Sequence, residues 1–116
     1  MCSALQYLHS REPPVVHRDI SGNNVMIDST DTVKLIDFGL AVQLQMSTGH
    51  TTVMSAHYSD ESRGTANFMA PEVCSADEQF RYSAQSDIWA FGCAVYQMAT
   101  GSVPYSGFSN PVALGI

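Results

Sequence analysis

The chain has few basic residues, no long apolar run and no signal for export. Five Lys and Arg residues stand against eleven Asp and Glu, which gives a formal net charge of −6. Nucleic acid and anionic membranes attract clustered positive charge, so both are disfavoured as partners. No run reaches the roughly 18 apolar residues that span a bilayer, and the N-terminus lacks a basic start followed by an apolar stretch. We expect a soluble, cytoplasmic protein.

The cysteines are also too few and too scattered for a metal site or a disulfide framework. Cys2, Cys74 and Cys93 lie far apart, and no Cys-x-x-Cys spacing is present. Zinc sites and dithiol redox pairs need such spacing. We therefore expect a reducing compartment and cysteines that act as small buried hydrophobic residues.

The first part of the chain predicts a helix followed by a β-hairpin. The apolar residues of Cys2–Ser10 have the spacing of a helix, and Pro13-Pro14 would end it. Val15-Val16 then follows as a short extended segment. Val25–Ile27 and Val33–Ile36 are β-rich runs separated by turn-forming residues. The expected fold class is α+β, mainly α with a short β-hairpin.

The second part predicts a loop and a long helix. From Gln43 to Arg63 the sequence is polar and without sustained period, which is typical of a mobile loop. Ser83 is a suitable N-cap and Gly101 a suitable C-terminal stop, so a helix is predicted over about 84–100. Apolar residues lie around nearly its whole circumference, which predicts burial in a core: Ile88, Trp89, Phe91, Val95, Tyr96, Met98 and Ala99.

Three short motifs carry the chemistry of the chain. His17-Arg18-Asp19 is followed by Asn24 and then by Asp37-Phe38-Gly39. The predicted hairpin begins just after Asn24 and ends just before Asp37, so it would bring two candidate metal ligands side by side. The order and spacing of these motifs resemble the catalytic loop and magnesium-binding motif of protein kinases.

Further segments extend this resemblance over nearly the whole chain. Gly64–Glu72 is similar to the end of a kinase activation segment, and Ser86–Gly92 to the start of the central helix of the larger kinase lobe. Thr65 resembles the residue that braces the catalytic loop in Ser/Thr kinases. The sequences of Gly64–Glu72 and Met98–Tyr105 most resemble those of kinases that act upstream in MAP kinase cascades, of the STE-like type.

The resemblance implies a domain layout. Residues 1–116 would form a partial kinase domain, the C-terminal lobe without its N-terminal lobe. The catalytic loop would cover 17–24, the activation segment 37–72 and the central helix about 84–100. It also implies ATP and Mg²⁺ as cofactors, and a protein with Ser or Thr hydroxyls as substrate.

The resemblance assigns catalytic and cofactor roles residue by residue. Asp19 would orient and deprotonate the substrate hydroxyl, although an isolated aspartate is more commonly a turn or cap residue. Asn24 and Asp37 would hold Mg²⁺, where the alternative is an ordinary polar residue at a strand end. Met26 would lie under the adenine of ATP, but a methionine in a hairpin more often fills a core.

The resemblance also implies supporting and regulatory roles. His17 would stack on Phe38 instead of acting as acid or base, and Asp87 would bind the catalytic-loop backbone. Arg18 would receive the phosphate of an activation loop modified by an upstream kinase. The sequence does not choose among the phosphate acceptors, most of which could serve only to keep the loop solvated: Ser47, Thr48, Thr51, Thr52, Ser55, Ser59 and Ser62.

The sequence departs from the kinase pattern in ways that leave other hypotheses open. Ser21 stands where Ser/Thr kinases carry a lysine that neutralises the transferred phosphoryl group. No glycine-rich loop or strand lysine precedes His17, and Glu72 is expected to lack its usual arginine partner and either to stay solvated or to find another. The chain could be a pseudokinase that binds other proteins, or an incomplete gene product, and we expect it to aggregate when expressed alone.

Overall fold

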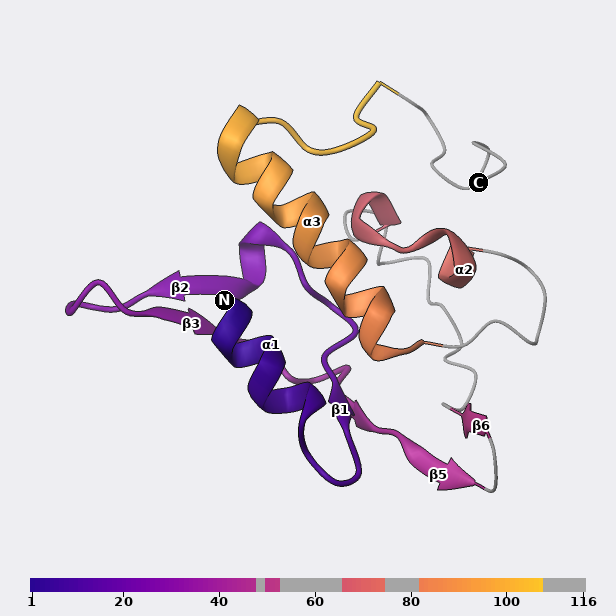
Figure 1. Cartoon of the computed structure of the whole chain (residues 1–116). Helices are drawn as coiled ribbons and strands as arrows, with labels where there is room; N and C mark the ends of the chain where they lie inside the picture. Colours follow the sequence, from indigo (N-terminus) through magenta and orange to yellow (C-terminus); the bar gives the residue numbers. More distant parts are fainter. Residues whose placement is uncertain (48–49, 53–65, 75–81, 108–116) are drawn as a thin grey trace.

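The computed structural model describes residues 1–47, 50–52, 66–74 and 82–107. These residues form a small α+β fold with three helices and short antiparallel strand pairs (Figure 1). The helices are α1 (Cys2–His9), α2 (Pro71–Cys74) and α3 (Ala84–Thr100), with 3₁₀ turns η1 (Gly22–Asn24) and η3 (Ala66–Phe68). The strands are β1 (Val15–Val16), β2 (Val25–Ile27), β3 (Val33–Leu35), β4 (Val42–Gln43), β5 (Gln45–Ser47) and β6 (His50–Thr52).

The predicted hairpin is confirmed as the antiparallel pair β2–β3, in which Val25 faces Leu35 and Ile27 faces Val33. Its turn is organised by one carboxylate. Asp28 Oδ1 accepts hydrogen bonds from the backbone and hydroxyl of Thr30 at 2.8 and 2.7 Å, and Asp28 Oδ2 lies 2.9 Å from Lys34 Nζ. Lys34 and the Thr30 donors lower the pKa of Asp28 well below its ordinary value.

The loop expected from Gln43 onward contains strands, so this part of the prediction is wrong. β4 pairs with the distant β1, with Val15 opposite Gln43, and β5 pairs with β6. Pairing across the fold supplies backbone hydrogen bonds that a local reading of polar sequence does not reveal. Residues 53–63 of the expected loop lie outside the described residues.

The boundaries of α3 are as predicted from its capping residues. Ser83 precedes the helix, and its backbone N–H donates to Ser86 Oγ at 3.2 Å. Gly101 ends the helix with φ at 70°, and its N–H donates to the Gln97 carbonyl at 2.8 Å. A left-handed residue is favourable there only for glycine, because it has no Cβ.

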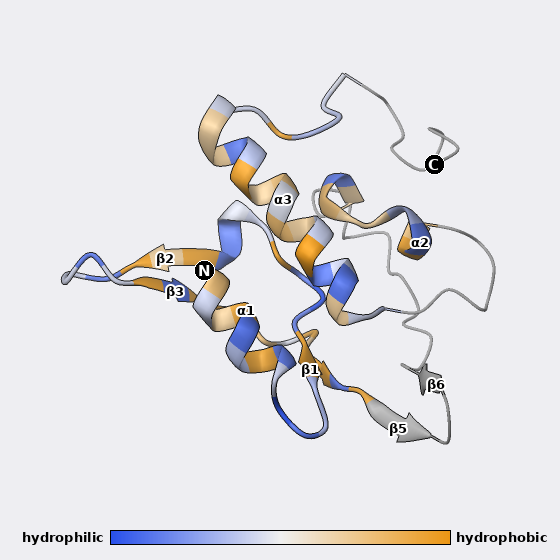
Figure 2. Cartoon of the chain, in the orientation of Figure 1, coloured by the Kyte–Doolittle hydropathy of each residue, from blue (hydrophilic) through white to orange (hydrophobic). Residues whose placement is uncertain are grey.

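The main core lies where α1, the segment after β1, η3 and α3 meet. In Figure 1, α1 and α3 lie on either side of the chain that leads from β1 to η1, and the β2–β3 hairpin projects away from them. Figure 2 shows hydrophobic residues along β1 and β2, both hydrophobic and hydrophilic residues in β3, and polar residues in the hairpin turn. The buried core residues are Leu5, Ile20, Phe68, Ala90, Cys93 and Ala94, and Val16 packs with Leu44 in a second cluster.

The all-round burial expected for α3 is wrong within the described part of the chain. Its small residues Ala90, Cys93 and Ala94 face the core. On the other side, Ile88 and Tyr96 are about half exposed, at 52% and 51%, and line an open groove together with Tyr105. The helix therefore buries one face against the described residues and leaves a second apolar face open.

The cysteines differ in burial. Cys93 is buried and Cys74 half-buried, as expected, but Cys2 is exposed, so that prediction is wrong for Cys2. Burial raises the pKa of the Cys93 and Cys74 thiols, and the charge of Glu72 raises that of Cys74 further. Both thiols stay protonated at neutral pH, which suits a packing role.

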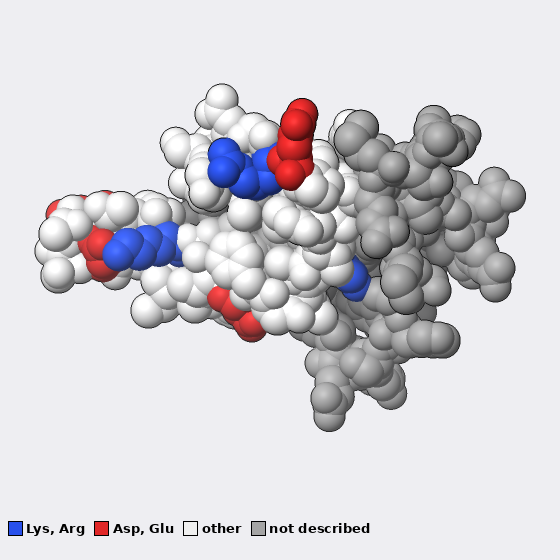
Figure 3. All heavy atoms as spheres, turned by 90° about the horizontal axis from the view of Figure 1, so that it is seen from below, with Lys and Arg blue, Asp and Glu red and all other residues white. Residues whose placement is uncertain are grey.

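The described residues show no clustering of positive charge on the face drawn in Figure 3. On the face seen in Figure 3, most basic side chains lie next to acidic ones. None of the described helices is long and apolar enough to cross a membrane. Among the same residues, no three His, Cys, Asp or Glu side chains gather into a metal-binding group.

Candidate active site in the loop between β1 and β2

The loop that leaves β1 is held at its start by a buried carboxylate of α3. Asp87 Oδ2 accepts a hydrogen bond from the His17 backbone N–H at 2.8 Å, and Asp87 Oδ1 accepts one from Arg18 N–H at 2.9 Å. Asp87 is only 1% exposed. Arg18 has a φ of 71°, an unfavourable value for a residue with a Cβ, and these bonds hold the backbone in that conformation. The expected contact of Asp87 with this loop is present.

Asp19 and Asn24, two of the three residues expected to act on a common cation, are in direct contact. Asn24 Nδ2 donates to the Asp19 carbonyl at 2.8 Å and to Asp19 Oδ2 at 2.9 Å. Asp19 Oδ1 is buried and has no hydrogen-bond partner. Because the amide nitrogen of Asn24 is used within the loop, its amide oxygen and Asp19 Oδ1 remain available to accept bonds from outside.

Asp37, the third residue, lies at the end of the hairpin that starts at Asn24. Ile36 N–H donates to the Asn24 carbonyl at 2.9 Å, which places the next residue beside the loop. The Asp37 side chain is exposed and its Oδ1 accepts a bond from Gly39 N–H at 3.3 Å. The structure therefore joins Asp19 to Asn24 by side-chain contact and brings Asp37 near them through the backbone.

His17 is a packing residue in this site. Its ring lies edge-on to the Phe38 ring with centroids 4.9 Å apart, as expected. His17 Nε2 bonds to the Ile36 carbonyl at 3.0 Å, and Asp19 N–H donates to His17 Nδ1 at 3.2 Å. An imidazole that donates through Nε2 and accepts through Nδ1 is the neutral tautomer, so His17 connects the start of the loop to Asp19 and to the hairpin.

The other end of the loop contacts the C-terminal half of α3. The Gln97 side chain lies against Gly22, where a Cβ would meet Gln97 Oε1 at 2.5 Å. Ser21, the residue in place of the usual lysine, is buried, and its carbonyl accepts a bond from Asn24 N–H at 3.1 Å. Only glycine fits at position 22 without displacing Gln97.

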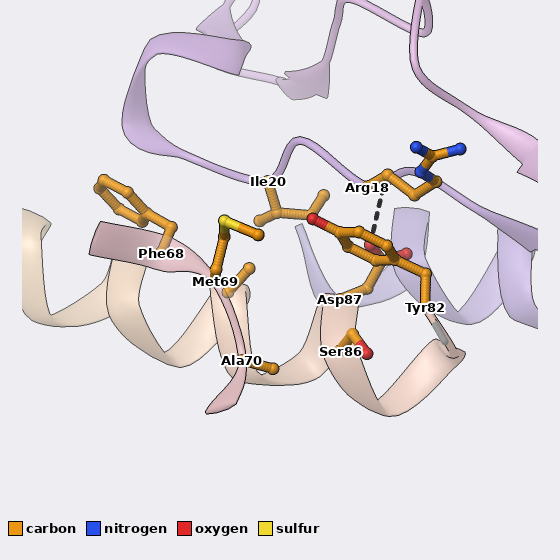
Figure 4. Close-up of a pocket in the computed structure, with 9 residues that line it drawn as sticks. Arg18, Ile20, Phe68, Met69, Ala70, Tyr82, Ser86 and Asp87 are labelled. Carbon is orange, nitrogen blue, oxygen red and sulfur yellow. Dashed lines mark hydrogen bonds between the residues drawn. The ribbon is translucent and has the colours of Figure 1, made fainter. Parts of the chain in front are cut away.

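Arg18 lies beside a small pocket on the side of the loop that faces η3. Figure 4 shows Arg18 and Tyr82 at one end of this pocket and Phe68 and Met69 at the other. The Arg18 guanidinium lies 5.1 Å from the Tyr82 ring centroid, within range of a cation–π contact. Arg18 Nε is buried without a hydrogen-bond partner.

Glu72 finds a partner other than arginine. Ser86 Oγ donates to Glu72 Oε1 at 3.0 Å, which ties α2 to the first turn of α3. Of the two alternatives left open by the sequence, that Glu72 stays solvated or that it finds another partner, the second is observed, with a hydroxyl group as the partner.

Comparison with known families shows to which family the chain belongs. The family model described as "Protein kinase domain" matches residues 1–112. The chain belongs to the protein kinase family. The relatives that it resembles are named as Ser/Thr protein kinases.

Its relatives include kinases from yeast and human. "Serine/threonine-protein kinase TOS3" of Saccharomyces cerevisiae is 38% identical over 111 residues, covering 93% of this chain and 19% of the relative. Human "Serine/threonine-protein kinase Nek10" is 41% identical, covering 90% of this chain and 8% of the relative. Human "Mitogen-activated protein kinase kinase kinase 19" is also 41% identical, covering 93% and 8%. The kinase chain thus spans 19% or less of the length of these relatives.

The donor set of this kinase loop suits a magnesium ion. Mg²⁺ prefers hard oxygen ligands and is usually held by one or two carboxylates together with substrate phosphates and water. The amide oxygen of Asn24 and the exposed carboxylate of Asp37 supply such ligands from the two ends of one hairpin. Most of the coordination would come from nucleotide and water, as is common for nucleotide-bound magnesium.

Met26 does not fill a core among the described residues. It lies in β2 opposite Lys34 and is 54% exposed. The alternative of a methionine buried in the hairpin is therefore wrong for this part of the kinase, and the thioether is accessible on the hairpin surface.

Most candidate phosphate acceptors lie where side chains are not described. Ser47 falls in β5, and Thr51 and Thr52 in β6, of which only the backbone is described. The others, together with the expected brace residue, lie outside the described residues: Thr48, Ser55, Ser59, Ser62 and Thr65.

Sequence reasoning missed two side chains that hold this kinase loop. His9 Nε2 lies 2.8 Å from Asp87 Oδ2, and Gln97 packs on Gly22. His9 and Asp87 are 78 positions apart, so no local sequence pattern predicts their contact. A basic residue in the last turn of a helix was the one available signal, and it is explained equally well by the helix dipole.

Proposed function

We propose that this chain forms the C-terminal lobe of a Ser/Thr protein kinase that transfers the γ-phosphoryl group of ATP to a hydroxyl of a protein substrate. The contact of Asn24 Nδ2 with the Asp19 carboxylate at 2.9 Å is the observation that carries the proposal. It holds a potential proton acceptor and a potential metal ligand in one fixed arrangement, which is what phosphoryl transfer requires of a protein.

Asp19 would orient and deprotonate the substrate hydroxyl. Its Oδ1 is buried and unpartnered, so it can accept the hydroxyl proton while Oδ2 stays bound to Asn24. The hydroxyl oxygen then bonds to the γ-phosphorus, the bond from that phosphorus to the β,γ-bridging oxygen breaks, and ADP leaves with the bond electrons.

Asn24 and Asp37 would hold Mg²⁺, and Met26 would lie under the adenine. The ion would supply positive charge that offsets the negative charge developing on the transferred phosphoryl group. The exposure of Met26 on β2 supports an adenine contact, because an apolar side chain there is free to cover a flat ring.

Arg18 would bind a phosphate placed on the activation segment by an upstream kinase, and Thr65 would brace the catalytic loop. The unpartnered Nε of Arg18 supports this, since guanidinium groups bind phosphate through paired N–H donors. The acceptor would be one of the Ser and Thr residues between 47 and 62. We place this kinase in the cytoplasm, in line with its scattered, unpaired cysteines.

Membership of a MAP kinase cascade is a narrower part of the proposal. Cascade membership is supported by the similarity to human mitogen-activated protein kinase kinase kinase 19 and by the sequences of residues 64–72 and 98–105. Phosphorylation of purified MAP kinase kinases, with unrelated kinase substrates as controls, tests it. Equal rates on both groups of substrates would contradict cascade membership and leave the kinase activity standing.

The kinase activity itself is tested with the protein expressed from its complete gene. Transfer of labelled phosphate from ATP to a protein substrate is measured with Mg²⁺ for the wild type and for the variants Asp19→Asn and Asp31→Asn. We expect Asp19→Asn to lose at least about a hundredfold in kcat, because the proton acceptor is gone. The exposed hairpin residue Asp31 should tolerate the same change. Equal activity of Asp19→Asn and wild type would refute the assignment.

A pseudokinase that binds other proteins is the second candidate, and Ser21 favours it. A buried hydroxyl replaces the ammonium group that neutralises the phosphoryl charge in Ser/Thr kinases. Thermal unfolding with and without magnesium-ATP separates the two, since a ligand bound by the folded state raises the melting temperature. A rise in melting temperature together with turnover supports the enzyme. The absence of both the rise and the turnover supports the pseudokinase.

A further inference from the structure

Ser21 puts a short, neutral side chain at a place where phosphoryl transfer calls for positive charge. It is 6% exposed and lies two residues after Asp19. Asp19 Oδ1 is buried without a hydrogen-bond partner, and Asp19 forms no ion pair within the described part of the chain. A serine hydroxyl can donate one hydrogen bond but carries no charge. The carboxylate of Asp19 is therefore left without a cation from its own loop.

The basic side chains of the described residues are engaged elsewhere. Lys34 Nζ lies 2.9 Å from Asp28 Oδ2 in the hairpin turn. The guanidinium groups of Arg11 and Arg18 lie over tyrosine rings, at 4.1 and 5.1 Å from the ring centroids. Both contacts are within the range of a cation–π interaction. None of these three cations takes the place that Ser21 leaves without charge.

The charge balance of the chain favours a cation that arrives with the substrate. Eleven Asp and Glu residues stand against five Lys and Arg, a formal net charge of −6. Asp37, exposed at the end of the hairpin, adds a second carboxylate near Asp19. A negative surface attracts basic partners and orients them as they approach. A basic segment of a protein substrate is thus drawn to the same site.

An extended substrate segment can bring its own cation to Asp19. Side chains of an extended chain alternate between two faces, so a residue two positions from the acceptor lies on the acceptor's side, about 6.5 Å away. The flexible stem of a lysine or arginine can reach back over that distance. The charged group has donors for both Asp19 Oδ1 and a phosphoryl oxygen, and the second lone pair of Oδ1 still accepts the substrate hydroxyl.

We propose that Ser21 is a specificity-determining residue, which leaves room beside Asp19 for a lysine or arginine that lies two residues before or after the acceptor hydroxyl of the substrate. The inference rests on the proposed kinase function and names its substrate class, proteins with the acceptor in a basic segment. The cation takes no part in the bonds that form and break. It only offsets negative charge on the transferred phosphoryl group, so turnover depends on its presence.

The test compares peptide mixtures with the protein expressed from its complete gene. Each mixture has a fixed serine acceptor and random residues elsewhere, except that the position two before or two after the acceptor is lysine, arginine or norleucine. Norleucine has nearly the shape of the lysine stem without its charge. Initial rates at low peptide concentration, with magnesium-ATP fixed, are measured for the wild type and for Ser21→Lys. Ser29→Lys adds the same charge at an exposed position of the hairpin turn and is the matched control.

We expect the wild type to act on the lysine and arginine mixtures at least about tenfold faster than on the norleucine mixture at one of the two positions, because a hydrogen-bonded charge is lost with norleucine. Ser21→Lys should reduce this ratio to within about threefold by raising the rate on norleucine, since the loop then supplies the cation itself. Ser29→Lys should keep the ratio of the wild type.

Three results would overturn the inference in different ways. Equal wild-type rates on the lysine and norleucine mixtures would contradict it directly, and this result needs no variant that folds. An unchanged preference in Ser21→Lys would place the recognition of basic residues elsewhere. Transfer by Ser21→Lys alone would mean that no substrate residue replaces the missing charge, and it would favour the pseudokinase. Absence of transfer by both proteins would instead refute the proposed kinase function itself.

Discussion

Replacing Asp87 by asparagine tests whether one buried carboxylate holds the loop between β1 and β2. The substitution keeps the size and shape of the side chain, so it changes little besides charge and hydrogen bonding. In the wild type the carboxylate accepts three bonds of 2.8 to 2.9 Å. An asparagine side chain can still accept a hydrogen bond at its oxygen. Its NH₂ group, however, must face an N–H donor that was bonded to a carboxylate oxygen in the wild type.

The expected cost follows from the bonds that are lost or weakened. If the amide oxygen of the new asparagine keeps its bond with the Arg18 N–H, its NH₂ group faces the His17 N–H and cannot accept from it. His9 can adapt by changing tautomer, so that its Nε2 accepts a hydrogen bond from the NH₂ group. One bond to a charged acceptor is then lost, at about 1.5 to 3 kcal/mol, and the Arg18 bond is weakened to a neutral one, at about 1 kcal/mol. The free energy of unfolding should fall by about 2.5 to 4 kcal/mol, a large fraction of the stability of an ordinary domain.

Urea unfolding at fixed protein concentration measures this change. The midpoint should fall while the slope stays the same, because the surface exposed on unfolding is unaltered. Asp31→Asn is the matched control: Asp31 is exposed in the hairpin turn with φ at 59°, a conformation that asparagine tolerates, so its effect should stay within about 0.5 kcal/mol. A loss below about 1 kcal/mol in Asp87→Asn would refute the idea that this carboxylate organises the loop.

Two further predictions concern the other end of the loop and the hairpin turn. Gly22→Ala should destabilise the protein by at most about 1 kcal/mol, because the flexible end of the Gln97 side chain can move away from the added methyl group, and adding Gln97→Ala should remove this cost. Simple additivity in this double-mutant cycle would contradict the observed approach of the two residues. The Asp28 carboxyl should titrate below its ordinary value of 3.8 in the folded state, as read by its carbon-13 shift. Because its folded pKa is lowered, its stabilising effect is complete above that ordinary value and is lost as the pH falls through the folded pKa. A midpoint at the ordinary value, or no change on Lys34→Met, would contradict the turn described here.

The elements that the sequence predicts correctly are those whose structure is decided locally. The hairpin β2–β3 joins neighbouring runs through a turn rich in Asp, Ser and Thr, so its pairing needs no information from elsewhere in the chain. The ends of α3 follow from Ser83 and Gly101, whose preferences are set by backbone geometry at a helix terminus. The stacking of His17 on Phe38 was implied by the kinase resemblance and is confirmed by the ring geometry.

The features that the sequence did not predict depend on partners far away along the chain. β4 forms because Val42 and Gln43 meet β1, and nothing in a polar stretch indicates that a distant strand will come to it. The apolar circumference of α3 showed that the helix can be buried, but not which side the described residues would cover. The Asp87 contact with the loop came from family resemblance, whereas the contact of His9 with the same carboxylate became visible only in three dimensions.

The loop between β1 and β2 takes its shape from α3 more than from any sheet. Asp87 in the first turn holds the loop at His17, and Gln97 three turns later contacts it at Gly22. Ten residues of helix separate these two points by about 15 Å, so the length of a regular helix sets the span over which the loop must stretch. The capping residues that were readable in the sequence place both Asp87 and Gln97 within one continuous helix. A loop anchored at two points of one rigid element can keep an unfavourable φ at Arg18, because neither end can relax without breaking contacts to the same helix.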